Sequence, residues 1–166
     1  EGGTKGLTIS GRATVTNCHI HGHSSVGIDA ANATADINDA TTISANYMYD
    51  NASFPLVVNA SVELESDNHF YNPATESAPD TSKAWNAIRF YGNISDTYTM
   101  EALEVPWYRD GTLSVSNAVF TINPGCIVKF TSGSKLLIYD TASLIAEGTA
   151  ESPIIFTSSN NSAVWG

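Results

Sequence analysis

Three histidines lie at alternating positions near the start of the chain. His19, His21 and His23 occur in the segment NCHIHGHSS, residues 17–25. Side chains two residues apart on a β-strand lie on the same face, and His-x-His on a strand is a ligand spacing for metals such as zinc. We therefore predict His19 and His21 as metal ligands on an outward face. The alternative is an ordinary polar strand face, because His23 follows Gly22, where the chain is expected to turn.

A second group of potential ligands consists of carboxylates. Glu63, Glu65 and Asp67 alternate around Leu64, so they would form an outward row on a strand. Ca²⁺ binds several oxygen ligands, and such a row supplies carboxylate oxygens. The sequence thus predicts a Ca²⁺ site here, with a solvated strand face as the alternative. No other cofactor is predicted.

Aromatic residues suggest a third kind of chemistry, the binding of carbohydrate. Trp85, Trp107 and Tyr108 could stack on sugar rings, or they could cover junctions between turns, which is the usual role of large aromatic residues. A glycosidase would need two carboxylates about 5 to 9 Å apart, and a lyase would need a basic residue beside carboxylates or Ca²⁺. No motif selects either arrangement, so no catalytic residue is predicted.

The composition limits the partners of the chain. Its 166 residues include 17 acidic and 7 basic side chains, for a net charge of −10. Such a charge disfavours nucleic acid and anionic membrane surfaces, and no apolar run approaches the ~20 residues of a membrane span. Charged residues make up only 14% of the chain, and the polar surface must come from Ser, Thr and Asn. That balance favours β structure with many turns.

Imperfect repeats organise these residues. Asn17, Asn46 and Asn68 each follow a short alternating apolar run and precede another, at steps of 29 and 22 residues (46−17 and 68−46). Short strands at such a period predict a solenoid, and the absence of helical periodicity favours a parallel β-helix. The three asparagines would then occupy equivalent corners and form a hydrogen-bonded ladder.

The repeats predict one β-helix domain over residues 1–166. Residues 1–90 form the turns with the Asn ladder, residues 113–166 form the later turns, and loops leave the solenoid at about 72–84 and 91–112.

Cys18 and Cys126 would lie about four turns apart, or ~19 Å. They are therefore too far apart for a disulfide, and Cys18 is expected in the core.

The later turns resemble a known family. The pieces that match secreted bacterial right-handed parallel β-helix repeat proteins, which have a pectate-lyase-like solenoid fold, are Pro124-Gly125, Val128-Lys-Phe130, Leu144-Ile-Ala-Glu-Gly148-Thr149 and Pro153-Ile-Ile-Phe156-Thr-Ser158. The resemblance is strong over residues 111–159 and loose over 14–90. It implies an all-β, single-stranded right-handed parallel β-helix and an extracellular or cell-surface location, but it says little about function, because this fold has many functions.

The ends of the chain suggest how it assembles. Leu7 and Ile9 already belong to a turn, and Val164 and Trp165 fall where another would begin. Open ends of a solenoid invite pairing, so we expect either head-to-tail association of copies into a filament or an origin as a segment cut from a longer chain. The expected function is a non-catalytic structural or adhesive solenoid. The alternative is a carbohydrate-binding or carbohydrate-active module, with glycans as partners.

Overall fold

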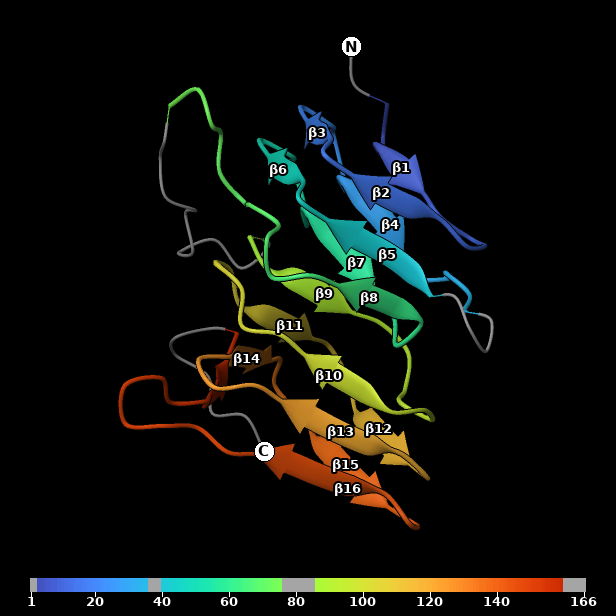
Figure 1. Cartoon of the computed structure of the whole chain (residues 1–166), viewed down its shortest axis with the longest axis vertical. Helices are drawn as coiled ribbons and strands as arrows, with labels where there is room; N and C mark the ends of the chain where they lie inside the picture. The colour runs from blue at the N-terminus through green and yellow to red at the C-terminus, as the bar shows by residue number, and fades with distance from the viewer. Residues whose placement is uncertain (1–2, 36–39, 76–85, 160–166) are drawn as a thin grey trace.

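The chain forms a parallel β-solenoid of about six turns (Figure 1). The computed structural model describes residues 3–35, 40–75 and 86–159. Within these ranges there are strands and turns but no helix, and all strand pairs are parallel. No helix long and apolar enough to span a membrane occurs in the same ranges. The predicted all-β solenoid is thus confirmed.

One sheet runs the length of the solenoid. Its strands, in spatial order, are β1 (Leu7–Thr8), β4 (Ile28–Ala30), β7 (Leu56–Val58), β9 (Ile88–Phe90), β11 (Trp107–Arg109), β14 (Ile127–Phe130) and β17 (Ile155–Ser158). Each turn of the chain adds one strand. The registers show that a turn takes between 19 residues, from Ile88 to Trp107, and 32 residues, from Leu56 to Ile88.

The remaining sheets divide the solenoid into two halves. The first half contains the sheet β2 (Thr14–Thr16), β5 (Thr41–Ser44), β8 (Val62–Leu64) and the pair β3 (His19–His21), β6 (Tyr47–Tyr49). The second half contains the pair β12 (Leu113–Ser116), β15 (Leu136–Tyr139) and the sheet β10 (Tyr98–Met100), β13 (Val119–Ile122), β16 (Ser143–Ala146). The stacks β2–β5–β8 and β10–β13–β16 follow each other on one face of the molecule (Figure 1), yet they are separate sheets.

Residues with left-handed backbone conformation turn the chain at the corners. Asn17 and Ala45, with φ of 54° and 53°, precede the strand pair β3–β6, and Asn117 and Asp140 occupy the corner between β12 and β13 and between β15 and β16. Asparagine and aspartate tolerate this conformation better than other non-glycine residues. The short strands thus follow from turn residues placed every few positions.

Stacked apolar side chains form the core. Along most strands buried and exposed residues alternate, and the inward residues of successive turns lie above one another, as in the column Val15, Ile43 and Leu64. Fully burying one such side chain stabilises the fold by roughly 1.5–3 kcal/mol. Because each turn is covered by its neighbours, this stabilisation depends on stacking.

Residues 91–112, expected as a loop outside the solenoid, instead form part of a regular turn. Ile94 bridges to Val115, β10 pairs with β13, and β11 lies between β9 and β14. The strands here have only three residues each, too few for a clear alternation in sequence. In the other predicted loop, 72–84, a turn occupies residues 73–75, and the positions from 76 onward lie outside the described residues.

Candidate functional site

The predicted asparagine ladder exists, with one correction. Asn46 Nδ2 donates to Asn68 Oδ1 at 3.1 Å, and both residues are buried. In the first turn the equivalent position belongs to Cys18, whose backbone N–H donates to Asn46 Oδ1 at 3.0 Å. Asn17 lies one residue earlier, at the corner, with an exposed side chain. The true repeat is therefore 28 residues, from Cys18 to Asn46, and Asn17 is not part of the ladder.

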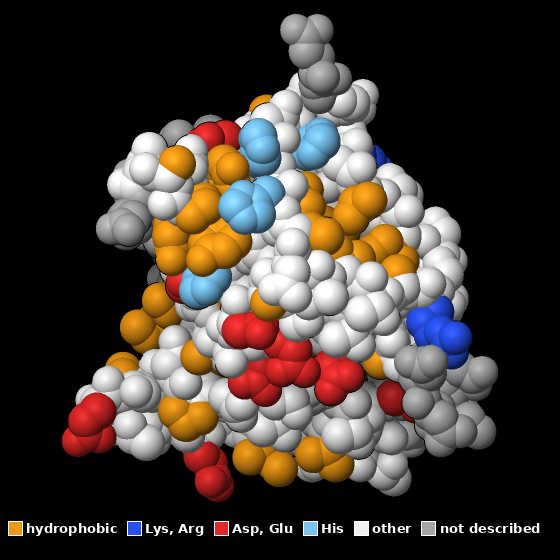
Figure 2. All heavy atoms as spheres, turned by 45° about the horizontal axis from the view of Figure 1, so that its top comes forward, with side chains coloured by type: hydrophobic (Ala, Val, Ile, Leu, Met, Phe, Trp, Pro, Cys, Tyr) orange, Lys and Arg blue, Asp and Glu red, His pale blue; other side chains and the backbone are white. Residues whose placement is uncertain are grey.

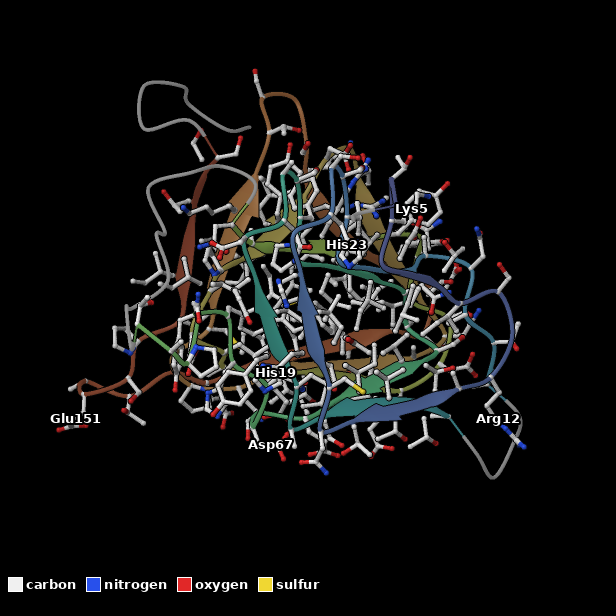
Figure 3. The ribbon with its side chains drawn as sticks, turned by 90° about the horizontal axis from the view of Figure 1, so that it is seen from above. Lys5, Arg12, His19, His23, Asp67 and Glu151 are labelled. Atoms are coloured by element: carbon white, nitrogen blue, oxygen red, sulfur yellow. The ribbon has the colours of Figure 1, made fainter. Side chains whose placement is uncertain are left out.

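His19 and His21 point outward from β3, as predicted, and their rings lie against tyrosine rings. The His19 ring lies 5.0 Å from that of Tyr47, which in turn lies 4.8 Å from His69, and the His21 ring lies 4.7 Å from Tyr49. Figure 2 shows the pale blue histidines beside apolar side chains on this face. The His21–Tyr49 and Tyr47–His69 rings are stacked face to face, whereas the His19 and Tyr47 rings are tilted by 43°. His23 lies beyond the end of β3, after the turn at Gly22 (Figure 3).

A bridge from Glu104 continues this column toward the second half. Its carboxylate lies 2.8 Å from His69 Nδ1 and accepts a hydrogen bond from the backbone N–H of Phe70 at 3.0 Å. Glu104 follows β10 in sequence, whereas His69 follows β8. The bridge thus joins adjacent turns.

The predicted metal ligands do not form a ready site. Among the described residues, no group of three or more His, Cys, Asp or Glu side chains could hold a metal ion. Glu63 and Glu65 are exposed at β8, whereas Asp67 Oδ1 accepts a hydrogen bond from the backbone N–H of Ala45 at 2.8 Å. Metal binding by the histidines and Ca²⁺ binding by the carboxylates stay predictions, which unfolding experiments with added Zn²⁺ or Ca²⁺ would test.

The prediction that Trp107 stacks on sugars is wrong. Trp107 is 1% exposed, and its indole N–H donates to the backbone oxygen of Glu101 at 2.8 Å. Its ring fills the core and cannot meet a ligand. Tyr108, the next residue, points outward and lies 5.1 Å from the Phe54 ring. Trp85 lies outside the described residues.

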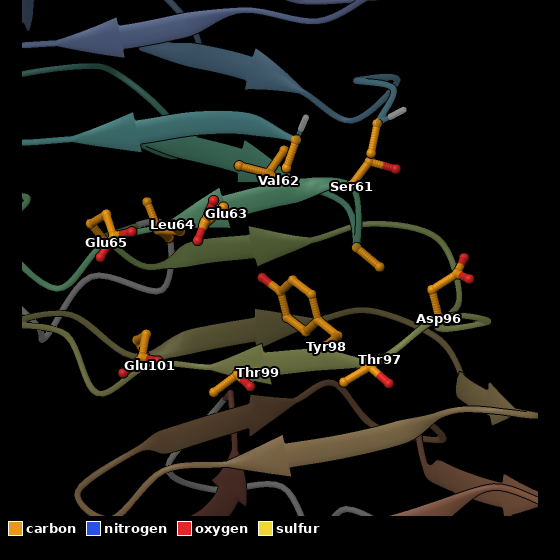
Figure 4. Close-up of a pocket in the computed structure, with 13 residues that line it drawn as sticks. Ser61, Val62, Glu63, Leu64, Glu65, Asp96, Thr97, Tyr98, Thr99 and Glu101 are labelled. Carbon is orange, nitrogen blue, oxygen red and sulfur yellow. The ribbon is translucent and has the colours of Figure 1, made fainter. Parts of the chain in front are cut away.

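A groove separates β8 from β10 on the face that carries both stacks (Figure 4). Its volume is about 720 Å³. Its polar lining includes Glu63 and Glu65 from the β8 side and Asp96, Thr99 and Glu101 from the β10 side. The groove forms because, among the described strands, β8 pairs only with β5, and β10 only with β13. Sequence analysis missed the wall of the groove that β10 forms, since it placed residues 91–112 in a loop.

Tyr98 lies at the floor of the groove. The residue is 6% exposed, its ring packs 5.2 Å from that of Phe90, and its hydroxyl has no hydrogen-bond partner. Burial, followed by the charge of Glu101, raises the pKa of this phenol far above its usual range, so the hydroxyl stays neutral. An unpaired buried hydroxyl costs about 1–3 kcal/mol. In the described part of the chain, two other buried side-chain atoms share this lack of a partner, His23 Nδ1 and Arg109 Nε.

The last described turn leaves core positions exposed. Leu144 stacks on the buried Phe120 but is itself 37% exposed. Of the residues predicted for self-association, Leu7 is exposed at the opposite end of the solenoid, and Ile9 is buried in the first turn. Val164 and Trp165 lie outside the described residues.

The two cysteines are free, as expected from their separation. Cys126 is buried, and burial raises the pKa of its thiol to about 11. Cys18, expected in the core, is exposed. It occupies the ladder position of the first described turn.

Comparisons with known proteins give no relative: no family model, no curated protein and no solved structure matches this chain.

Proposed function

We propose that the protein is a non-catalytic structural or adhesive β-solenoid that associates head to tail. β1 and β17 are the two edge strands of the seven-stranded sheet, whose strands are all parallel. Pairing of β17 in one copy with β1 in the next would keep that polarity and continue the sheet. Because the two surfaces differ, such a contact does not close on itself and yields a filament.

The observation that carries this proposal is the exposure of inward side chains on the last described turn. Leu144, which is 37% exposed, and the half-buried Phe156 occupy the same inward columns as the buried Phe120 and Val128. A further turn stacked on them would bury this apolar surface, which is the main favourable term in association. At the other end, exposed Leu7 and the free edge of β1 provide the contact.

Two aspartate substitutions test the proposal. Leu144 (37% exposed) points along an inward column, whereas Leu137 (39% exposed) pairs with Ser114 and points outward. We expect wild type and Leu137→Asp to form assemblies that lengthen with concentration in sedimentation and electron microscopy, and Leu144→Asp to stay monomeric with an unchanged circular dichroism spectrum. A monomeric wild type, a closed dimer, or equal behaviour of the two variants would overturn the proposal.

The finer assignment rests on the resemblance of residues 111–159. We propose on that basis that the chain belongs with the secreted bacterial right-handed parallel β-helix proteins and acts at the cell surface. Antibody labelling of intact cells, compared with permeabilised cells, tests the location. Labelling only after permeabilisation would contradict it.

A carbohydrate-binding role is the second candidate. Tyr108 and Phe54 form an aromatic pair on the outer side of the seven-stranded sheet, and the Arg89 guanidinium lies 5.8 Å from the Phe54 ring. Aromatic faces beside a polar group are typical of ligand sites. A glycan array with wild type and Tyr108→Ala tests this role, and the absence of any retained glycan would remove it.

A further inference from the structure

The long walls of the groove between β8 and β10 are two free sheet edges. β8 ends the sheet β2–β5–β8, and β10 begins the sheet β10–β13–β16. A strand paired on one side only presents a row of unpaired backbone N–H and C=O groups on the other. The ligand that complements such a row is an extended peptide, which adds as a further strand.

The charge of the groove indicates the side chains of that peptide. Glu63 and Glu65 lie on one wall, and Asp96 and Glu101 lie on the other. None of the described lining residues is Lys, Arg or His. The groove is therefore negative, like the chain as a whole with its net charge of −10. A basic occupant is favoured, because electrostatic complementarity both steers the encounter and selects the partner.

An independent observation points to a ligand at the floor of the groove. The Tyr98 hydroxyl is buried, has no hydrogen bond and points into the groove (Figure 4). The Phe90 and Phe120 rings hold the Tyr98 ring in place, at centroid distances of 5.2 and 6.4 Å. A ligand that reaches the floor would satisfy this hydroxyl.

A bare metal ion fits less well. Within the described ranges no three acidic, histidine or cysteine side chains come together as a metal site. The volume of about 720 Å³ lies in the range of sites for organic ligands, about 300–1,000 Å³, and is larger than a bare ion needs.

We propose that this groove binds an extended peptide segment with Lys or Arg at alternating positions. Its backbone pairs with the free edges of β8 and β10. Its basic side chains, all on one face because of the two-residue period of a strand, lie beside Glu63 and Glu65. On the other face it hydrogen-bonds the Tyr98 hydroxyl.

Two synthetic peptides of the same composition test the strand geometry. One alternates Lys and Thr over about ten residues, and the other places the lysines in one block. Calorimetry at low salt is expected to show about tenfold tighter binding of the alternating peptide, with weakening as salt screens the charges. Equal binding of both peptides, of spermine, or of an amino-sugar oligomer would overturn the proposal.

Variants of the protein locate the site. Glu63→Gln/Glu65→Gln is expected to weaken binding about tenfold, whereas the matched control Glu147→Gln/Glu151→Gln, which removes the same charge from an exposed loop, leaves it unchanged. Tyr98→Phe is expected to weaken binding about fivefold while the melting temperature stays the same or rises, because it removes an unpaired group. Full binding by Tyr98→Phe, or equal losses in both double variants, would refute the site.

Discussion

Replacement of Asn46 by alanine tests the physical basis of the ladder. The Asn46 side chain donates to the backbone oxygen of Val15 at 2.9 Å and to Asn68 Oδ1 at 3.1 Å, and it accepts from the Cys18 N–H at 3.0 Å. Asn68 Oδ1 retains a second donor, the backbone N–H of Asn46, at 3.2 Å. The substitution therefore leaves the Cys18 N–H without its partner and removes one donor from the Val15 oxygen, which stays in the parallel β2–β5 ladder.

The expected loss of stability follows from these two groups. An unsatisfied buried group costs about 1–3 kcal/mol, and the Cys18 N–H, beside an exposed side chain, falls at the low end because water can reach it. The lost bond to the Val15 oxygen adds about 1 kcal/mol, so we expect Asn46→Ala to lower the free energy of unfolding by about 2 kcal/mol. For a chain of this size that corresponds to about 4–8 °C in melting temperature.

Asn17→Ala is the matched control. Among the residues that the structure describes, the Asn17 side chain makes one hydrogen bond, an exposed contact of 3.4 Å with Thr16. Its replacement is expected to cost about 1 kcal/mol or less, mainly because alanine tolerates the left-handed backbone less well. Urea unfolding, followed by circular dichroism and by the fluorescence of buried Trp107, measures both values. Similar losses in the two variants would refute the assignment of the ladder.

Three further outcomes follow from the backbone and the core. At Gly27 a Cβ atom would lie 2.5 Å from the Pro55 oxygen, so Gly27→Ala should destabilise by about 2 kcal/mol or more, whereas Gly11→Ala, with open space around it, should change stability little in the same urea assay. Ala45→Gly should stabilise by roughly 0.5–1 kcal/mol, because it relieves a φ of 53°; a lower melting temperature would contradict this. The unfolded chain releases the Cys126 proton at lower pH than the folded chain, whose thiol has a pKa of about 11, so the free energy of unfolding should fall between pH ~9 and ~11; Cys126→Ala should flatten that decline, and an unchanged slope would show that the thiol does not cause it.

Sequence reasoning reached the fold because each solenoid turn repeats the same local signals. The alternation in Thr14–Thr16 and His19–His21 correctly places Val15 and Ile20 inside and the histidines outside. It failed by one residue at Asn17, since Asn is equally suited to the corner and to the ladder, and only the register across turns separates the two roles.

The candidate groove could not be predicted in the same way. It depends on the absence of pairing between β8 and β10, which is a property of two strands that are distant in sequence. The three-residue strand at Tyr98 carries too little periodicity to be recognised. Likewise, Trp107 follows Pro106, a loop signal in sequence, but its strand is central to the seven-stranded sheet and its ring is buried.

The division of the solenoid into two stacks has a mechanical consequence. In the described part of the chain, the seven-stranded sheet is the one sheet shared by both halves, and the groove lies where the stacks β2–β5–β8 and β10–β13–β16 meet. Bending that widens the groove strains the contacts of Glu104 with His69 and Phe70 but breaks no ladder of backbone hydrogen bonds, whereas bending at any other level must break one. We therefore expect the molecule to bend at this level about the seven-stranded sheet. An occupant that pairs with the free edges of both β8 and β10 would reduce this bending.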